Sequence, residues 1–371
     1  MLVALLLASC APPSAAPTLT APPFTRVVSV STPTHTPPPP TATATKTPTA
    51  TRTPTATPVP PTATATVPPV ARLMAVGDLM LARTVGDGTV ANGAEWPFAG
   101  VADSFSQADI LIGNLECAVG EAGEPVRKAY TFQAPPAAAE ALEQVGFDVV
   151  SLANNHALDY GPEGLADMLP RLEAAGIRPV GAGANAAAAR APVIVEHNGV
   201  RVAFLAYVDV PVEGSTGFDT RSWSAGPDTP GIAWADEAQM TEDIRAAVPL
   251  ADLVAVLLHF GLEGRVEVTA AQARTAHAAV EAGASLVIGA HAHVLQRVEE
   301  YGDGLIVYNL GNFVFDGFGQ TSNYSAIFSA TLTPDGITEY SFVPVMVERG
   351  VPRPATAEEA KVVFARLSGG G

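Results

Sequence analysis

An apolar segment followed by two closely spaced histidines constrains this chain more than any other feature. Residues 285–288 are one serine followed by three aliphatic residues, and Gly289 comes next. Such an apolar run predicts a buried strand. Gly289 is expected to let the backbone turn sharply. His291 and His293 follow just past the C-terminal end of the strand, where open α/β sheets bind their ligands. Imidazole is the commonest protein ligand for transition metals, and two histidines one residue apart can reach two neighbouring ions.

Four other predicted strands end in side chains of the same kind. Asp78 follows the strand at 72–77, Asn114 and Glu116 follow 108–113, Asn155 and His156 follow 147–152, and His259 follows 252–258. Each group alone is more often a turn or a hydrogen-bonded core residue than a ligand. Their ordered recurrence predicts that all five groups lie at the same edge of one sheet. Two carboxylates, an amide and several imidazoles form a donor set suited to Mn, Fe, Zn or Mg.

The order of the predicted elements indicates an α/β (α+β) fold. Strands alternate with predicted helices at residues 97–107, 136–145, 162–175, 236–248 and 270–282. A hairpin is expected at 191–207 through an Asn-Gly turn, and an antiparallel pair at 325–333 and 337–347. This pattern predicts a sandwich of mixed sheets with helices outside, followed by an exposed helix at 358–367.

Composition separates a long N-terminal segment from the folded part. Residues 11–70 contain 17 Pro and 18 Thr, no acidic residue and one aromatic residue, Phe24. Such a segment cannot bury enough apolar surface to offset its ordering entropy, so residues 11–71 are predicted to be a disordered linker. One large α/β domain is predicted at 72–348, followed by a C-terminal tail with a helix at 349–371.

The predicted domain carries a strong negative charge. The chain has 20 basic and 37 acidic residues, and every acidic residue lies beyond residue 71. A field of this sign disfavours binding to nucleic acids and to anionic membrane surfaces. An anionic substrate would need a metal centre to supply local positive charge.

The first ten residues have the form of an export signal. Their apolar run is far shorter than the ~20 residues needed to span a bilayer, and it matches the hydrophobic part of a signal peptide. Leu7-Ala8-Ser9-Cys10 resembles the bacterial lipobox, so Cys10 is expected to be lipidated and to tether the protein to the membrane on the extracytoplasmic side. Secretion without lipidation is the alternative. If Cys10 is lipidated, Cys117 is the only other thiol and no intrachain disulfide can form.

Six sequence blocks occur in an order that resembles the CapA family of poly-γ-glutamate or capsule synthesis proteins. The blocks are AVGDLML, IGNLE, SLANNHALDYG, LLHFG, GAHAHVLQ and YNLGNFVFD, and the resemblance covers about residues 72–347. It implies the fold of the calcineurin-like metallophosphatase superfamily, a sandwich of two mixed β-sheets flanked by helices.

The resemblance also implies roles for individual residues. Asp78 matches the first metal-binding aspartate, and Glu116, or less well Asn114, matches the bridging carboxylate. Asn155 matches a metal-binding asparagine, and His156 a transition-state donor or general acid. His259 and His291 would complete the second metal site, and His293 would be a further ligand of the first. The histidine of the superfamily's usual D-x-H motif falls on Met80, a poor ligand for hard ions.

Several nearby residues have two open interpretations each. Arg83 could clamp an anionic substrate or form a surface salt bridge, and Lys128 and Tyr130 could contact substrate or lie at a strand edge. Asn312 could orient a metal ligand or form a buried turn, and Asp159 and Tyr160 could support His156, although Asp159 could instead cap a helix. His197 and His277 are predicted to be non-functional.

These observations predict a cell-surface-tethered, metal-dependent hydrolase or transferase with two divalent ions. Its substrate would be an anionic envelope or capsule polymer, or a phosphoester, and it could belong to a capsule-synthesis complex. A pair of ions that share a carboxylate would activate water for attack on the scissile bond, and His156 would protonate the leaving group. The alternative is a non-catalytic accessory that binds or exports the polymer.

Overall fold

The computed structural model describes residues 26–27, 68–213 and 217–370. The predicted signal segment with Cys10 and nearly all of the predicted linker lie outside the described residues. Two linker residues form the short strand β1 (Arg26–Val27), which pairs antiparallel with β20 (Gly336–Glu348). Among the described residues, no helix combines the length and the apolar character needed to cross a bilayer.

The larger sheet has nine strands and a parallel centre. Strands β2 (Ala71–Leu79), β3 (Ile110–Leu115), β6 (Val149–Ser151) and β7 (Arg178–Val180) run parallel to one another. On the other side of β2 lie β18 (Asn312–Val314), β19 (Tyr324–Thr333), β20 and β21 (Val351–Pro354). The predicted antiparallel pair near the C-terminus is confirmed as β19 and β20.

The smaller sheet has six strands, in the order β16-β17-β15-β14-β10-β9. Their bounds are β9 Val193–His197, β10 Val200–Asp209, β14 Leu253–Phe260, β15 Leu286–Ala290, β16 Val298–Tyr301 and β17 Gly304–Val307. Strands β10, β14, β15 and β17 are parallel. The predicted hairpin is confirmed as β9 and β10, with Asn198 (φ 50°) and Gly199 (φ 80°) in its turn.

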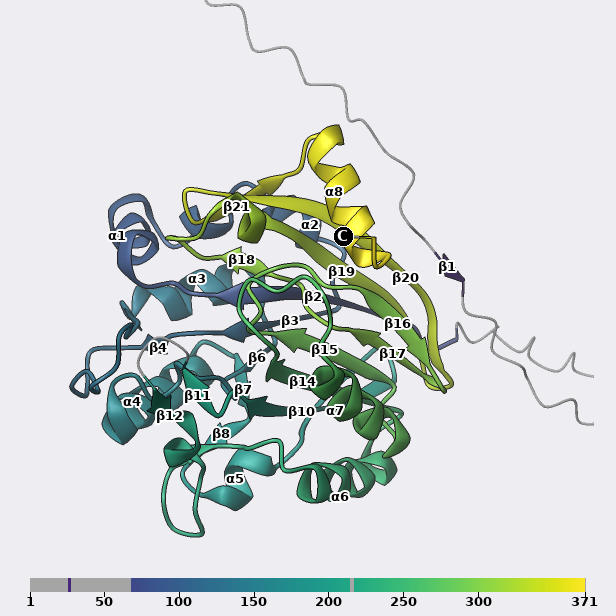
Figure 1. Ribbon diagram of the computed structural model, residues 1–371, viewed down its shortest axis with the longest axis horizontal. Helices are drawn as coiled ribbons and strands as arrows, with labels where there is room; N and C mark the ends of the chain where they lie inside the picture. Colours follow the sequence, from purple (N-terminus) through teal and green to yellow (C-terminus); the bar gives the residue numbers. More distant parts are fainter. Residues whose placement is uncertain (1–25, 28–67, 214–216, 371) are drawn as a thin grey trace, which may run out of the picture.

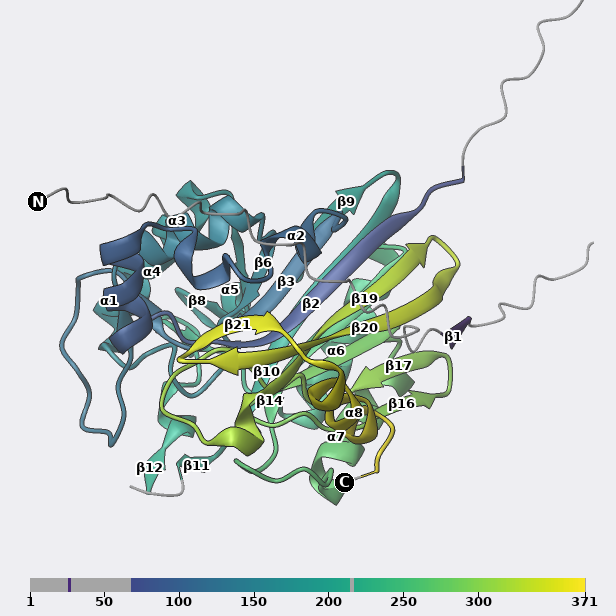
Figure 2. The same ribbon diagram turned by 90° about the horizontal axis from the view of Figure 1, so that it is seen from above.

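Helices cover the outer faces of both sheets. Figure 1 shows α6 (Glu237–Ala247) and α7 (Ala270–Glu281) below the smaller sheet, and α8 (Ala357–Leu367) above the larger one. Helices α1 (Arg83–Asn92), α2 (Ala102–Phe105), α3 (Ala137–Val145) and α4 (Gly161–Ala174) lie beside β2, β3 and β6 (Figure 2). The predicted two-sheet α/β sandwich is therefore confirmed.

The remaining elements are short connections around this frame. They are β4 Ala118–Val119, β5 Gln133–Ala134, β8 Ala182–Gly183, β11 Val212–Glu213, β12 Phe218–Asp219, β13 Gly231–Ile232 and α5 Ala186–Arg190. The 3-10 helices are η1 Trp96–Phe98, η2 Thr220–Trp223, η3 Val248–Leu250 and η4 Gln320–Asn323.

Strands of the smaller sheet are apolar on both faces because each face has its own packing partner. Along β10, Ala203 and Leu205 pack in the cluster that includes α6 and α7, whereas Val202 and Phe204 belong to the core between the two sheets. Parallel strands covered on both sides read as continuous apolar runs for this reason. The core between the sheets reaches up to the polar ends of the strands.

Two predictions about the outer elements differ from the structure. The helix predicted at 97–107 is broken into η1 and α2, and at Gly100 a Cβ atom would lie 2.5 Å from the Pro352 carbonyl oxygen. The C-terminal helix was predicted to be exposed, but α8 buries Val363 and Leu367, and β21 pairs with β20. Strand β21 and helix α8, which follow the predicted domain boundary, thus contribute to the packed structure.

Candidate metal centre

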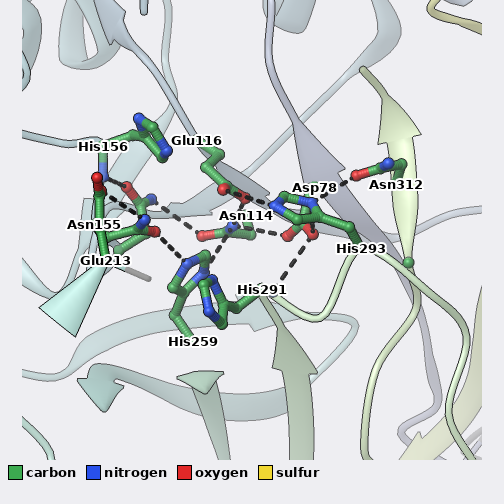
Figure 3. A network of polar contacts seen from close by, with 12 residues as sticks. Asp78, Asn114, Glu116, Asn155, His156, Glu213, His259, His291, His293 and Asn312 are labelled. Atoms are coloured by element: carbon green, nitrogen blue, oxygen red, sulfur yellow. Dashed lines mark hydrogen bonds and ion pairs between the residues drawn. The ribbon is translucent and has the colours of Figure 1, made fainter. Parts of the chain in front are cut away.

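The five groups of polar side chains meet, but they come from two sheets. Asp78, Asn114 and Glu116 lie at the ends of β2 and β3 in the larger sheet, with Asn155 and His156 just beyond β6. His259 lies in β14, and His291 and His293 follow β15, in the smaller sheet. The prediction of a single sheet edge is therefore wrong. The parallel strands of both layers end on the same side of the sandwich, which brings the side chains together (Figure 3).

The alternation of side chains along β14 explains why His259 points into the site. Leu253, Ala255 and Leu257 face the core between the sheets, whereas Val254, Val256 and Leu258 face the helices. Successive side chains of a strand point to opposite faces, so His259 follows the first set. Its side chain is buried between the two layers.

The two histidines after β15 occupy an uncommon backbone conformation. His291 has φ 87° and His293 has φ 53°, a region that costs a non-glycine residue of order 1 kcal/mol or more and is enriched at functional sites. Gly289 lies inside β15, so the prediction that the chain turns at this glycine is wrong. A Cβ atom at Gly289 would lie 1.9 Å from the carbonyl oxygen of Tyr308, so the glycine is required for close approach of the chain.

Asn114 lies at the centre of the cluster. Its Nδ2 donates to Asp78 Oδ1 at 2.9 Å and to Glu116 Oε2 at 3.1 Å, and lies 3.2 Å from His259 Nδ1. Its Oδ1 accepts from Nδ2 of Asn154 at 3.1 Å. The amide thus fixes both carboxylates and one imidazole at the seam between the sheets.

Two groups of three possible ligands share the Glu116 carboxylate. One group is Glu116, His259 and His291, and the other is Asp78, Glu116 and His293. In each group one potential ligand atom per residue lies within 4.8 Å of the others. His293 Nδ1 is 3.3 Å from Asp78 Oδ2, and His293 Nε2 is 3.6 Å from Glu116 Oε1.

The two groups of possible ligands are suited to divalent cations because two of their buried polar atoms have no hydrogen-bond partner in the described part of the chain. Glu116 Oε1 and His291 Nδ1 are buried without a hydrogen-bond partner among the described residues. Burial first, and then the neighbouring charge of Asp78, raises the pKa of Glu116 well above its ordinary value. Burial and the adjacent histidines lower the pKa of His259 and of His291. Both imidazoles are therefore neutral near pH 7, the form that binds metals.

Asn312 lies beside the centre and orients one of its histidines. In the sheet Asn312 is paired with Asp78, which is in turn paired with Asn114. The Asn312 Oδ1 atom is 2.8 Å from Nδ1 of His293. Burial lowers the pKa of His293, but the hydrogen bond and charge of Asp78 outweigh it, so this pKa lies above its ordinary value. Of the two interpretations of Asn312, the orienting contact is present.

His156 stands at the wall of the pocket next to the cluster. Its Nδ1 is 2.7 Å from Asp159 Oδ2, and its ring stacks on Phe132 with centroids 4.3 Å apart. Burial lowers the pKa of His156, and the Asp159 charge opposes that effect. Asp159 does not cap α4, whose N-cap residue is Tyr160 without a side-chain cap bond. The supporting contact of Asp159 is therefore the one that the structure contains.

Lys128 matches neither of its two predicted interpretations. Its side chain is fully buried and forms ion pairs with Asp159 at 2.7 Å and with Glu213 at 2.5 Å. It also lies 3.3 Å from His156 Nδ1. Lys128 is neither in a strand nor at the surface of the pocket. Long-range ion pairs from two other segments hold it beneath His156.

Arg83 lies on the rim of the pocket. It forms an ion pair with Asp316, and its guanidinium lies 4.7 Å from the centroid of the Phe132 ring. The pocket has a volume of about 240 Å³ and is lined by Arg83, His156, Glu263, His293, Phe315 and Tyr130 among others. The salt bridge is thus present, and the arginine still faces the space next to the cluster.

Met80 and the two other histidines lie outside the cluster. Met80 is fully buried, and its sulfur accepts from the backbone N–H of Ala82 at 3.3 Å. His277 stacks on Tyr301 with centroids 3.7 Å apart, and His197 lies 3.0 Å from Asp109.

Sequence reasoning missed three residues of the site. Asn154 donates a hydrogen bond to Asn114, and Glu213 accepts one from Asn155. Glu263 has a carboxylate oxygen within 4.8 Å of a ring nitrogen of His291 and of one of His293. Asn154 directly precedes a predicted ligand and Glu263 is four residues after His259, so proximity in sequence could have indicated both. Glu213 comes from a separate hairpin, and no local pattern marks it.

Comparison with known proteins assigns the family. The model of the bacterial capsule synthesis protein family PGA_cap matches residues 72–317. This chain belongs to the PGA_cap family. It is 32% identical over 289 residues to the PGA biosynthesis protein CapA of Bacillus subtilis (strain 168), an alignment that covers 77% of this chain and 74% of that protein. It is 32% identical over 290 residues to the capsule biosynthesis protein CapA of Bacillus anthracis, covering 76% and 69% of the two chains.

Two further comparisons are more distant from this PGA_cap chain. A Mycobacterium tuberculosis (strain H37Rv) protein named "Probable polyglutamine synthesis accessory protein" is 32% identical over 227 residues, 58% of each chain. A solved structure described as a novel phosphatase from Mycoplasma pneumoniae has a TM-score of 0.49 and 12% identity, and covers 79% of this chain and 96% of its own. At that TM-score no conclusion is drawn from the likeness.

Proposed function

We propose that this PGA_cap protein is a metal-dependent hydrolase or transferase that acts in capsule or poly-γ-glutamate synthesis. Its substrate would be an anionic envelope polymer or a phosphoester. The observation that supports this most is the sharing of Glu116 between two groups of buried oxygen and nitrogen donors. A carboxylate common to two neighbouring ligand groups can hold two ions close together, as in two-ion centres.

The chain's own residues would divide into two sets around this centre. Asp78, Glu116 and His293 would hold one ion, and Glu116, His259 and His291 would hold the other. The side-chain oxygen of Asn155 lies 2.7 Å from Nε2 of His259. Such ions, when bound, lower the pKa of water and polarise the scissile bond. The mixed donors suit Mn, Fe, Zn or Mg. Two ions also offset the negative charge that would otherwise repel an anionic substrate.

His156 and Arg83 would act on the substrate from the pocket wall. Asp159 occupies Nδ1 of His156, which leaves Nε2 as the nitrogen that can exchange a proton with a bound molecule. Protonation of the leaving group is the role proposed for it. Arg83, held by Asp316 and Phe132, would position an anionic group of the substrate.

Metal analysis combined with an activity screen tests the proposal. The purified protein is expected to contain near-stoichiometric Mn, Fe or Zn, and His291→Ala is expected to lose it. His156→Ala should keep the metal and lose about 10²-fold or more of the activity on the responsive substrate among phosphodiesters and γ-glutamyl polymers. His277→Ala, outside the cluster, is the matched control.

A non-catalytic role in polymer binding or export is the second candidate. Met80 cannot supply a hard ligand at its position, and the Mycobacterium tuberculosis relative is named an accessory protein. A metal-free protein with no phosphodiesterase activity under added Mn²⁺ would favour this role over catalysis.

The proposed location is extracytoplasmic, through a lipid on Cys10. The capsule-related names of the relatives support a role at the cell envelope. The proposed organisation is a signal segment at 1–10, a linker at 11–71, the domain at 72–348 and a terminal segment at 349–371. Cys10→Ala is expected to move the protein from the membrane fraction to the medium or soluble fraction. An unchanged membrane fraction would exclude the anchor.

A further inference from the structure

A third carboxylate, that of Glu263, lies against the two histidines of the 291–293 loop. One carboxylate oxygen of Glu263 and one nitrogen each of His291 and His293 lie within 4.8 Å of one another. Glu263 also lines the pocket beside the cluster, and it is exposed whereas both histidines are buried. The centre is therefore bounded by a carboxylate on its solvent side as well as by Asp78 and Glu116 inside.

Hydrogen bonds to neighbouring segments fix the loop that carries Glu263. The backbone N–H of Gly264 donates to the Ala292 carbonyl at 2.8 Å, which ties this loop to the residue between the two histidines. The carbonyl of Arg265 accepts from Nε2 of Gln296 at 2.9 Å. Gln296 is buried and also accepts from Gln272 of α7 at 2.8 Å. The loop is thus fixed on both sides of the 291–293 turn.

Glu263 has no neutralising partner where it lies. Among the described residues no hydrogen bond or ion pair involves its carboxylate, and the ion pair nearest in sequence joins Arg265 to Glu267. His291 Nδ1 is buried and also lacks a hydrogen-bond partner among the described residues. A cation between these groups would give a partner to the Glu263 carboxylate and to the His291 nitrogen, and would offset the repulsion between the carboxylates of Glu263 and Glu116.

We propose that Glu263 is a metal ligand that closes the centre from the pocket side, in contact with the ion that His293 or His291 binds. This inference rests on the proposed metal-dependent function and adds a residue to it. With Asp78 and Glu116, Glu263 gives the centre three carboxylates, and this oxygen-rich set shifts its preference towards harder ions such as Mn²⁺ and Mg²⁺. Met80 contributes no hard ligand. The carboxylate of Glu263 would add an oxygen ligand that comes from a loop rather than from a strand end.

Mn²⁺ titration of the purified full-length protein tests the ligand role directly. Equilibrium dialysis or calorimetry would compare wild type, Glu263→Ala, Glu263→Asp and Glu267→Ala. Glu267 lies in the same loop, is exposed and is 3.8 Å from Arg265, so Glu267→Ala removes an equal charge without reaching the histidines. Glu263→Ala is expected to weaken Mn²⁺ binding by about 10- to 100-fold at an unchanged melting temperature, Glu263→Asp less, and Glu267→Ala by less than about twofold.

The outcomes separate this inference from the function on which it rests. If wild type binds Mn²⁺ and Glu263→Ala binds it equally well, Glu263 is not a ligand, even if the variant has lost activity. Equal weakening in Glu263→Ala and Glu267→Ala would assign the effect to general charge and also overturn the ligand role. Wild-type protein that binds no divalent ion would overturn the two-ion proposal, and the role of Glu263 with it.

Discussion

The Glu213 carboxylate accepts a hydrogen bond from the Asn155 side-chain amide at 2.9 Å. A carboxylate can only accept, so the amide nitrogen of Asn155 points to Glu213 and its oxygen points the other way. That oxygen lies 2.7 Å from Nε2 of His259. A residue from the β11 hairpin thereby sets which atom of Asn155 faces His259 in the candidate metal centre.

Replacing Glu213 by alanine should destabilise the protein without unfolding it. The change leaves the Asn155 amide unpartnered and Lys128 with one carboxylate fewer, and we expect the free energy of unfolding to fall by about 1–3 kcal/mol in urea denaturation. Glu213→Gln should lose less, because its carbonyl still accepts. Asp219→Ala on the facing strand β12, where Asp219 pairs with exposed Arg221, is the control. A stability loss as large in the control would contradict the expectation.

Replacing Lys128 by methionine should be more damaging. The fully buried Asp159 and the Glu213 carboxylate would both lose the lysine cation that they share, which typically costs about 3–5 kcal/mol. The double variant Lys128→Met/Glu213→Gln should be closer to wild type than the sum of the single effects. Lys361→Met, at an exposed pair with Glu358, should have almost no effect in the same unfolding assay. Simple additivity in the double variant would argue against coupling.

Gly289→Ala should prevent correct closure of the two histidines over the carboxylates. Its Cβ would lie 1.9 Å from the backbone oxygen of Tyr308, so β15 and the chain after β17 must separate. We expect a loss of stability above about 2 kcal/mol, seen as a lower melting temperature and reduced soluble yield. Gly319→Ala, where nothing lies within 4 Å of the added atom, is the matched control. A melting temperature equal to that of the control would show that the contact can relax.

Metal binding should release protons near and below neutral pH. Glu116 and His293 have raised pKa values in the metal-free protein, so they hold protons that a cation must displace. His259 and His291, with lowered pKa values, are already neutral and release few. Mn²⁺ affinity should therefore fall as the pH is lowered. Calorimetry in two buffers of different ionisation enthalpy measures the release, and buffer-independent heats at pH 6 would refute it.

The N-terminus of α8 should lose stability in acid through Glu359. Hydrogen bonds from Arg353 are the main reason that the pKa of Glu359 falls from 4.5 to about 2. Because the folded pKa is the lower one, this stabilisation is present above pH ~4.5 and is lost as the pH falls towards ~2. Glu359→Gln should cost about 1–2 kcal/mol at pH 7 and much less at pH 2.5. A penalty independent of pH would exclude the ionic contribution.

The candidate site side chains and their places at strand ends could be predicted because the signals are local. An apolar run up to residue 290 and a histidine beyond it lie within a few residues of each other, and so does the Asn-Gly turn of the β9–β10 hairpin. Asp78, Asn114, Glu116 and His259 were found in the same way. The order of the six blocks added the family, which the match to residues 72–317 confirms.

Tertiary packing decided what lies around those side chains. The two sheets bring Asp78 and His259 together across the sandwich, whereas the sequence predicted a single sheet edge. Lys128 and Glu263 come from loops and Glu213 from the short strand β11. Their positions depend on contacts with distant segments, and no periodicity in their own neighbourhoods specifies those contacts. The need for Gly289 comes from the carbonyl of Tyr308 on another segment. Local residue order specifies strands and their ends, but only packing between layers specifies which ends meet.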